Sequence, residues 1–194
     1  ELGDRTSYRL KNALLMGFAD ERIPLVEDEI KVIGKILPEA RLFVGPKATV
    51  RAFDRFAPAA DIIHLACHGQ FRAESPLFSS LHLADGRLTV RDICKHELSA
   101  ELVVLSACET GLSKVFAGDE ILGLARGFLA AGVSSLIVSL WAVNDAAAGR
   151  LMTDFYTEIQ RGTTTAASLR HSQLIAIERG DHPYLWSPFI LIGR

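Results

Sequence analysis

The chain has 194 residues, 49% of them hydrophobic, and its 21 Lys and Arg nearly balance 23 Asp and Glu, for a formal charge of −2. This composition supplies a real core and excludes an intrinsically disordered chain. With no excess of basic residues, it also argues against nucleic acid and membrane surfaces as partners.

Cysteine usage and the first residues bear on the compartment. Three cysteines without regular spacing argue against a disulfide framework and for a reducing compartment, so a cytoplasmic location is predicted. No signal peptide is recognisable in residues 1–10, and the longest apolar stretch, from Gly132 to Val143, is interrupted by serines and is shorter than the roughly 20 residues of a membrane span. Because the chain starts at Glu1 rather than Met, we expect a fragment or a processed chain.

Short apolar runs alternate with amphipathic stretches of helical length, which predicts an α/β domain with a mostly parallel sheet. The runs that end near Gly, Pro or polar residues are predicted as six strands: Ala13–Ala19, Ala40–Val44, Asp61–Cys67, Glu101–Ala107, Val133–Leu140 and Phe189–Ile192. The amphipathic stretches are predicted as helices: from Pro24 to Pro38, from Asp119 to Gly132, Ala146–Arg161 and Thr164–Glu178.

Two local patterns add detail to this outline. The residues from Leu81 to Leu88 are predicted to form a hairpin with its turn at Asp85-Gly86. Gly123 and Gly127 lie four residues apart in the predicted second helix, which indicates close packing on that face. Because no repeat, low-complexity tract or Pro-rich linker interrupts the pattern, residues 1–194 are expected to form a single domain.

Two predicted strands end in a reactive side chain followed by a glycine-containing turn. One segment reads Ile-Ile-His-Leu-Ala-Cys-His-Gly over residues 62–69, and the other reads Val-Val-Leu-Ser-Ala-Cys-Glu-Thr-Gly over residues 103–111. Parallel strands would bring His68 and Cys108 to the same carboxyl edge, where open α/β sheets place their sites. This pairing predicts a cysteine nucleophile served by an imidazole.

The neighbouring residues allow this prediction to be weighed against simpler ones. The amide groups of Gly69 and Cys108 could stabilise an oxyanion. A cysteine at a strand end is also commonly a buried structural residue. Strand alternation places Cys67 on the face opposite to that of His64 and His68, so this structural role is predicted for Cys67. A zinc site that adds Cys94 and His96 to these residues is disfavoured, because the spacing fits no paired zinc-ligand scheme.

The chain resembles the CHAT domains, which are caspase-like and separase-like cysteine peptidase domains. The resemblance lies in a series of motifs along nearly the whole chain: His-Leu-Ala-Cys-His-Gly at 64–69, Ser-Ser-Leu-His-Leu-Ala-Asp-Gly at 79–86, Leu-Ser-Ala-Cys-Glu-Thr-Gly at 105–111, Gly-Asp-Glu at 118–120, Ser-Leu-Trp-Ala-Val-Asn-Asp at 139–145, Phe-Tyr at 155–156 and Trp-Ser-Pro-Phe at 186–189. The resemblance implies a caspase-like three-layer α/β/α fold with a central sheet of about six strands. It also implies a catalytic dyad of His68 and Cys108 that needs neither cofactor nor metal.

The same resemblance suggests a specificity and a partner. Asp145 matches an acidic residue that helps separases to hold a basic side chain before the scissile bond, although an N-cap role for Asp145 is the simpler alternative. CHAT domains often follow tetratricopeptide repeats, so the domain is expected to be the C-terminal part of a longer protein, with a repeat region as a partner. The leading prediction is a cysteine endopeptidase that acts on a protein or peptide, and the alternative is a regulatory interaction module with an idle dyad.

Overall fold

A computed structural model describes residues 12–21, 23–72, 74–106, 117–141 and 143–193. Its centre is a six-stranded sheet in the order β2-β1-β3-β7-β8-β9. The strands are β1 (Ala13–Phe18), β2 (Arg41–Val44), β3 (Ile62–Cys67), β7 (Leu102–Ser106), β8 (Ser135–Ser139) and β9 (Phe189–Gly193). All neighbouring strands are parallel except the pair β8 and β9, so the predicted mostly parallel sheet of six strands is confirmed.

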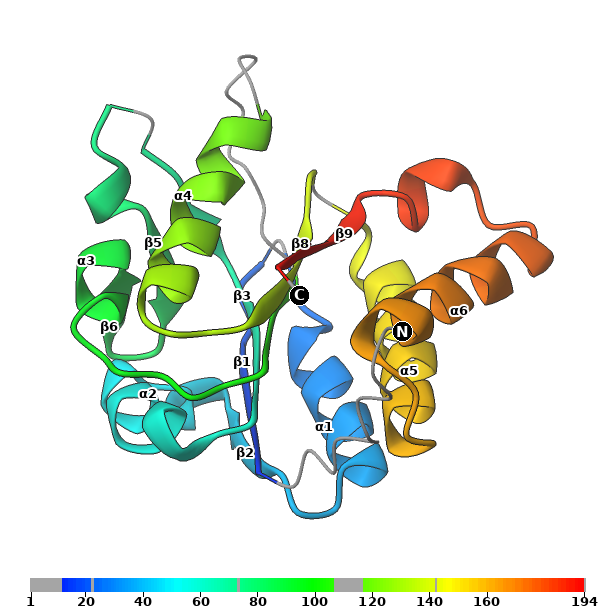
Figure 1. The fold of residues 1–194 in the computed structure, drawn as a ribbon, viewed down its shortest axis with the longest axis horizontal. Coiled ribbons are helices and arrows are strands. Elements are labelled where there is room, and N and C mark those ends of the chain that lie inside the picture. The colour runs from blue at the N-terminus through cyan, green and yellow to red at the C-terminus, as the bar shows by residue number, and fades with distance from the viewer. Residues whose placement is uncertain (1–11, 22, 73, 107–116, 142, 194) are drawn as a thin grey trace, which may run out of the picture.

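Helices cover both faces of this sheet and complete three layers (Figure 1). On one face lie α1 (Val26–Ile36), α5 (Asp145–Gln160) and α6 (Thr165–Glu178). On the other lie α2 (Val50–Phe56), α3 (Val90–Ile93) and α4 (Ala117–Ala130). Short 3-10 helices complete the described helical segments: η1 (Gly45–Lys47), η2 (Ala57–Ala59), η3 (Pro76–Phe78) and η4 (Pro183–Leu185). The sequence did not predict α2 and α3, which are only two turns and one turn long.

The alternation of side chains along the strands divides the buried residues into two cores. In β3, Ile63, Leu65 and Cys67 pack on the α2, α3 and α4 side, whereas Ile62 and Ala66 pack on the α1 and α5 side. Cys67 is fully buried in the first core. Its predicted structural role is therefore confirmed, and the parity of the strand directs residue 64 to the opposite face.

A second, smaller sheet follows β3 and contains β4 (Gly69–Gln70), β5 (Ser80–Leu83) and β6 (Gly86–Thr89). The predicted hairpin is confirmed as β5 and β6, but its turn was predicted one residue too late. Gly86 pairs with Leu83, so the two turn residues are Ala84 and Asp85.

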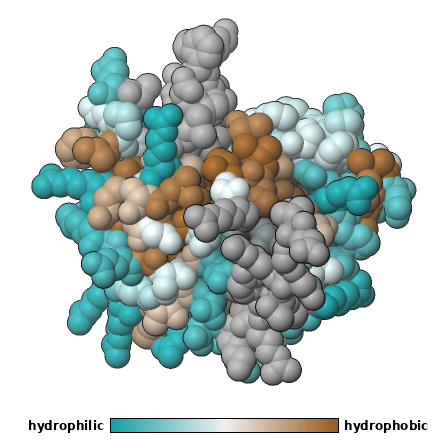
Figure 2. Space-filling view, in the orientation of Figure 1, coloured by the Kyte–Doolittle hydropathy of each residue, from teal (hydrophilic) through white to brown (hydrophobic). Residues whose placement is uncertain are grey.

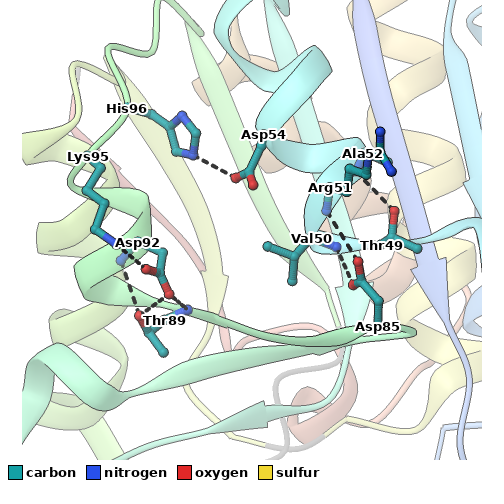
Figure 3. Close-up of polar contacts among 10 residues, drawn as sticks. All are labelled: Thr49, Val50, Arg51, Ala52, Asp54, Asp85, Thr89, Asp92, Lys95 and His96. Atoms are coloured by element: carbon teal, nitrogen blue, oxygen red, sulfur yellow. Dashed lines mark hydrogen bonds and ion pairs between the residues drawn. The ribbon is translucent and has the colours of Figure 1, made fainter.

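The side chain of Asp85 explains this shift. Its carboxylate accepts the backbone N–H groups of Val50 at 2.6 Å and of Arg51 at 3.5 Å, and so serves the amino end of α2 (Figure 3). At the other end of the hairpin, Thr89 and Asp92 form a capping box that starts α3. The hairpin is thus tied to a helix at each end.

The close packing predicted at Gly123 and Gly127 is confirmed for Gly127. A Cβ atom on Gly127 would lie 2.8 Å from Val90 Cγ1, so its absence lets α4 approach α3 closely. A Cβ atom on Gly123 would meet Pro76 at an ordinary distance of 3.8 Å.

Hydrophobic side chains gather in the middle of the face seen in Figure 2, over the edge strand β9. Residues 190–192 of this strand are only partly buried. Within the described part of the chain, none of the helices is both long and apolar enough to cross a membrane.

Candidate active site

The carboxyl ends of β3 and β7 lie side by side in the centre of the sheet. These two strands are parallel neighbours, and their register pairs Ala66 with Ser106 at this edge. His68 follows β3 directly and is partly buried, while Gly69 is buried at the start of β4. The parallel arrangement predicted for these two strand ends is confirmed, and this edge is where open α/β sheets bind their ligands.

A histidine that the sequence analysis did not select lies opposite His68. The antiparallel register of β4 and β5 pairs Gly69 with Leu81, and its extension by one residue places His82 across from His68. The backbone N–H of His82 donates to the His68 carbonyl at 2.8 Å. The two imidazole rings meet edge to face, with centroids 5.4 Å apart and an angle of 68° between their planes.

The surroundings of His82 favour its neutral form. Burial is the largest cause that lowers the pKa of His82, followed by the positive charges of Arg87 and His68. Arg87 is the cross-strand partner of His82 in β6. The carboxylate of Asp20 acts in the opposite direction, but the net shift of the pKa is downward.

Asp145 was expected either to cap a helix or to bind a substrate side chain. The N-cap of α5 is instead Asn144, whose side-chain oxygen accepts the backbone N–H groups of Ala146 and Ala147, so the capping prediction for Asp145 is wrong by one residue. Asp145 is the first residue of α5, and its Oδ2 atom accepts the Leu25 N–H at 3.2 Å.

The bond between Asp145 and Leu25 holds the start of α5 beside the start of α1. Asp145 also lines a groove of about 320 Å³ between these helices. Asp28, Asp154, Arg150 and Arg179 are among the other residues that line this groove. Charged residues of both signs therefore border the groove.

A buried polar cluster lies between the sheet and the α1 and α5 layer. His64 Nε2 is 3.0 Å from Glu29 Oε1, and His64 Nδ1 is 3.0 Å from the Tyr156 hydroxyl oxygen. His64 and Tyr156 are fully buried, and Glu29 is 6% exposed. Burial, followed by the negative charge of Glu29, raises the pKa of Tyr156 well above its ordinary value, so its hydroxyl keeps its proton.

Three more residues from the sequence motifs and the disfavoured zinc site are Cys108, Cys94 and Trp141. Cys108 lies outside the described residues, so its pairing with His68 stays a prediction. Cys94 is exposed at the end of α3, and its Sγ atom lies 3.8 Å from the Gly127 carbonyl oxygen. The Trp141 ring lies 5.5 Å from that of Tyr184 at an angle of 31°, and its indole N–H donates to the Tyr184 carbonyl, so these contacts are structural.

Comparison with known proteins places the chain in a family. The CHAT domain family model matches residues 5–194. Human and mouse tetratricopeptide repeat protein 28 are each 36% identical to this chain over 108 residues, which is 55% of the chain but only 4% of either relative's length. The comparison with these relatives thus concerns a small part of a much longer protein.

Solved structures with similar folds are far more distant in sequence. The crystal structure of gingipain R, an Arg-specific cysteine proteinase, superposes with a TM-score of 0.63 at 13% identity, over 95% of this chain and 46% of that one. The Drosophila initiator caspase Dronc gives a TM-score of 0.44 at 10% identity, over 87% of this chain and 74% of that one. The fold is a caspase-like three-layer α/β/α fold, and the chain belongs to the CHAT domain family.

Proposed function

We propose that the chain is a cysteine endopeptidase with Cys108 as nucleophile and His68 as general acid and base. The observation that carries the proposal is the register between β3 and β7. Ala66 pairs with Ser106, and Cys108 follows Ser106 by the same two residues by which His68 follows Ala66. Parallel neighbours with this register support an imidazole and a thiol at the same edge of the sheet.

The proposed reaction proceeds in two steps. His68 takes the thiol proton of Cys108, the thiolate attacks the scissile carbonyl carbon, and His68 returns the proton to the leaving amine as the C–N bond breaks. In the second step, His68 takes a proton from water, whose oxygen attacks the thioester. The C–S bond breaks, the acid product leaves, and His68 returns the proton to the thiolate.

The orientation of Gly69 supports its proposed part in an oxyanion hole. Opposed residues in an antiparallel pair alternate between hydrogen-bonded and non-hydrogen-bonded positions. The bond from the His82 N–H to the His68 carbonyl makes that pair the hydrogen-bonded one, so the next pair, Gly69 and Leu81, is not hydrogen-bonded. The Gly69 N–H therefore points away from β5, and a backbone N–H in that position suits a developing oxyanion.

Asp145 is the proposed determinant of a preference for Arg or Lys before the scissile bond. Its bond to the Leu25 N–H holds the carboxylate where α1 and α5 begin, at the same end of the sheet as His68. A positioned carboxylate is a natural partner for a guanidinium group. The name shared by the two curated relatives supports a tetratricopeptide repeat region of the parent protein as a partner that presents the substrate.

Proteome-wide mapping of cleavage sites tests the mechanism and the specificity together. The wild-type chain and a Cys94→Ala control should produce the same new termini, enriched in Arg or Lys before the cut, and Cys108→Ala should produce none. Cys94 is the matched control because it is an exposed cysteine at the end of α3. Cleavage that persists in Cys108→Ala would exclude the proposed nucleophile.

Thiol labelling near neutral pH separates the peptidase from the alternative function, a regulatory interaction module. An activated Cys108 should react with iodoacetamide faster than the exposed Cys94, because the thiolate is the reactive species. If the wild-type chain cleaves nothing and Cys108 is labelled no faster than Cys94, the interaction module is favoured.

A further inference from the structure

We propose that His82 is a positioning residue that holds the His68 imidazole in the orientation needed for proton transfer. The inference rests on the function proposed above, because it gives His68 the role of acid and base. It starts from the cross-strand pair described for β4 and β5, in which the two histidines face each other and their rings meet at 5.4 Å. Directly opposed residues of an antiparallel pair present their side chains on the same face.

The strand that carries His82 is anchored on several sides, which makes its ring a fixed support. Asp85 ties the turn to the start of α2, and the Ala84 N–H donates to the Ala48 carbonyl at 2.8 Å. At the start of β5, the Ser79 hydroxyl accepts the Arg72 N–H at 3.0 Å, and the Ser79 carbonyl accepts the Val90 N–H. A side chain on such a strand has little freedom to move away from His68.

An edge-to-face contact of two rings restricts rotation of both side chains, and such aromatic contacts are geometrically specific. A catalytic imidazole benefits because a small misplacement of a reacting group costs a large factor in rate. His82 Nε2 is buried and has no hydrogen-bond partner among the described residues, so the described fold does not use this nitrogen. The contact that the structure shows between the two side chains is the edge-to-face contact of their rings.

The charge of His82 suits this role. Burial, followed by Arg87 and His68, lowers the pKa of His82, and Asp20 opposes them without reversing the shift. A neutral ring beside His68 does not repel the proton that His68 must hold during the reaction. A second cation at this distance would disfavour the protonated form of His68.

The kinetic test compares substitutions that remove the ring with one that keeps an aromatic ring. His82→Ala should lower kcat about tenfold to hundredfold with little change in KM, whereas His82→Phe should keep most of the wild-type kcat. His82→Gln fills comparable space without a ring and should behave like His82→Ala, which preserves the comparison where alanine prevents folding. His171→Ala is the control, because His171 is a half-exposed histidine on α6 and its removal should leave kcat unchanged.

Nuclear magnetic resonance of the same variants gives a readout that does not depend on turnover. The ring protons of His68 should carry a ring-current shift from His82 that is lost in His82→Ala and His82→Gln and retained in His82→Phe. His68 resonances that do not move in His82→Ala would overturn the inference. A His82→Phe variant as slow as His82→Ala would overturn it as well.

The two readouts also separate this inference from the proposed function. A wild-type chain without peptidase activity, but with His68 resonances that respond to His82 as expected, would reject the peptidase while the positioning of His68 stands. An active wild-type chain with unchanged kcat in both His82→Ala and His82→Gln would keep the peptidase and reject the role of His82.

Discussion

Replacement of Tyr156 by phenylalanine tests the buried polar cluster of Glu29, His64 and Tyr156. The substitution keeps the packed ring but removes the hydroxyl that lies 3.0 Å from His64 Nδ1. His64 is fully buried, so water cannot replace the lost partner. A buried polar atom left without a partner costs about 1–3 kcal/mol, which for a domain of this size lowers Tm by roughly 2–12 °C at neutral pH.

The same substitution should have a different effect at high pH. Burial and Glu29 raise the pKa of Tyr156 in the folded state above the ordinary value of 10.0. Above pH 10 the unfolded chain releases the hydroxyl proton while the folded chain keeps it, so the unfolded state is favoured by about 1.4 kcal/mol for each further pH unit. Phenylalanine has no such proton, so the free energies of unfolding of wild type and variant should converge as the pH rises above 10.

Urea unfolding at a series of pH values from 7 to 11 measures both effects. The difference in free energy of unfolding between wild type and Tyr156→Phe isolates Tyr156, because other groups that titrate at high pH contribute equally to both chains. Tyr184→Phe is the control, since Tyr184 is 53% exposed and should give a small difference at all pH values. A difference for Tyr156→Phe that stays constant up to pH 11 would refute the reasoning.

Substitutions at three further positions test packing and capping through the free energy of unfolding in urea. Ser106→Ala should leave stability unchanged or raise it by about 1 kcal/mol, because the buried Ser106 hydroxyl has no hydrogen-bond partner among the described residues. A loss of stability of more than about 1 kcal/mol would contradict this expectation. Gly132→Ala should cost about 2 kcal/mol or more, since Gly132 has a φ of 107° and its new Cβ would lie 2.5 Å from the Leu98 carbonyl oxygen; a neutral result would show that the backbone shifts easily. Asp85→Ala should cost about 1 kcal/mol by removing the acceptor of the Val50 N–H, and Asp85→Asn, which keeps one carbonyl oxygen, should recover part of it.

The six sheet strands could be predicted because each is a local apolar run that ends at a turn-forming residue. The two helices at α2 and α3 could not, because each is too short for a repeating apolar pattern to develop. The start of α3 has a local capping box, whereas α2 is also held by Asp85, which reaches it from a turn 35 residues away in sequence. Such a contact belongs to the tertiary structure and leaves no signal in a local window.

The candidate site divides in the same way. His68 and Gly69 could be located because a strand that ends in a reactive residue and a glycine is a local pattern, and the parallel pairing of β3 with β7 supplies the rest. Burial and, after it, Arg87 across the hairpin lower the pKa of His82, and burial and, after it, Glu29 from another helix raise the pKa of Tyr156. Neither environment can be derived from the residues adjacent in sequence.

The register between β4 and β5 therefore determines the surroundings of His68 more than the local sequence motif does. A shift of one residue between β4 and β5 would turn His82 to the other face of the small sheet and place a neighbouring leucine opposite His68, because neighbouring residues of a strand alternate. Leu81 and Leu83, on either side of His82, are buried in the core, and a one-residue shift would expose both. The apolar residues that flank His82 thus fix the register, and the register sets the histidine against His68.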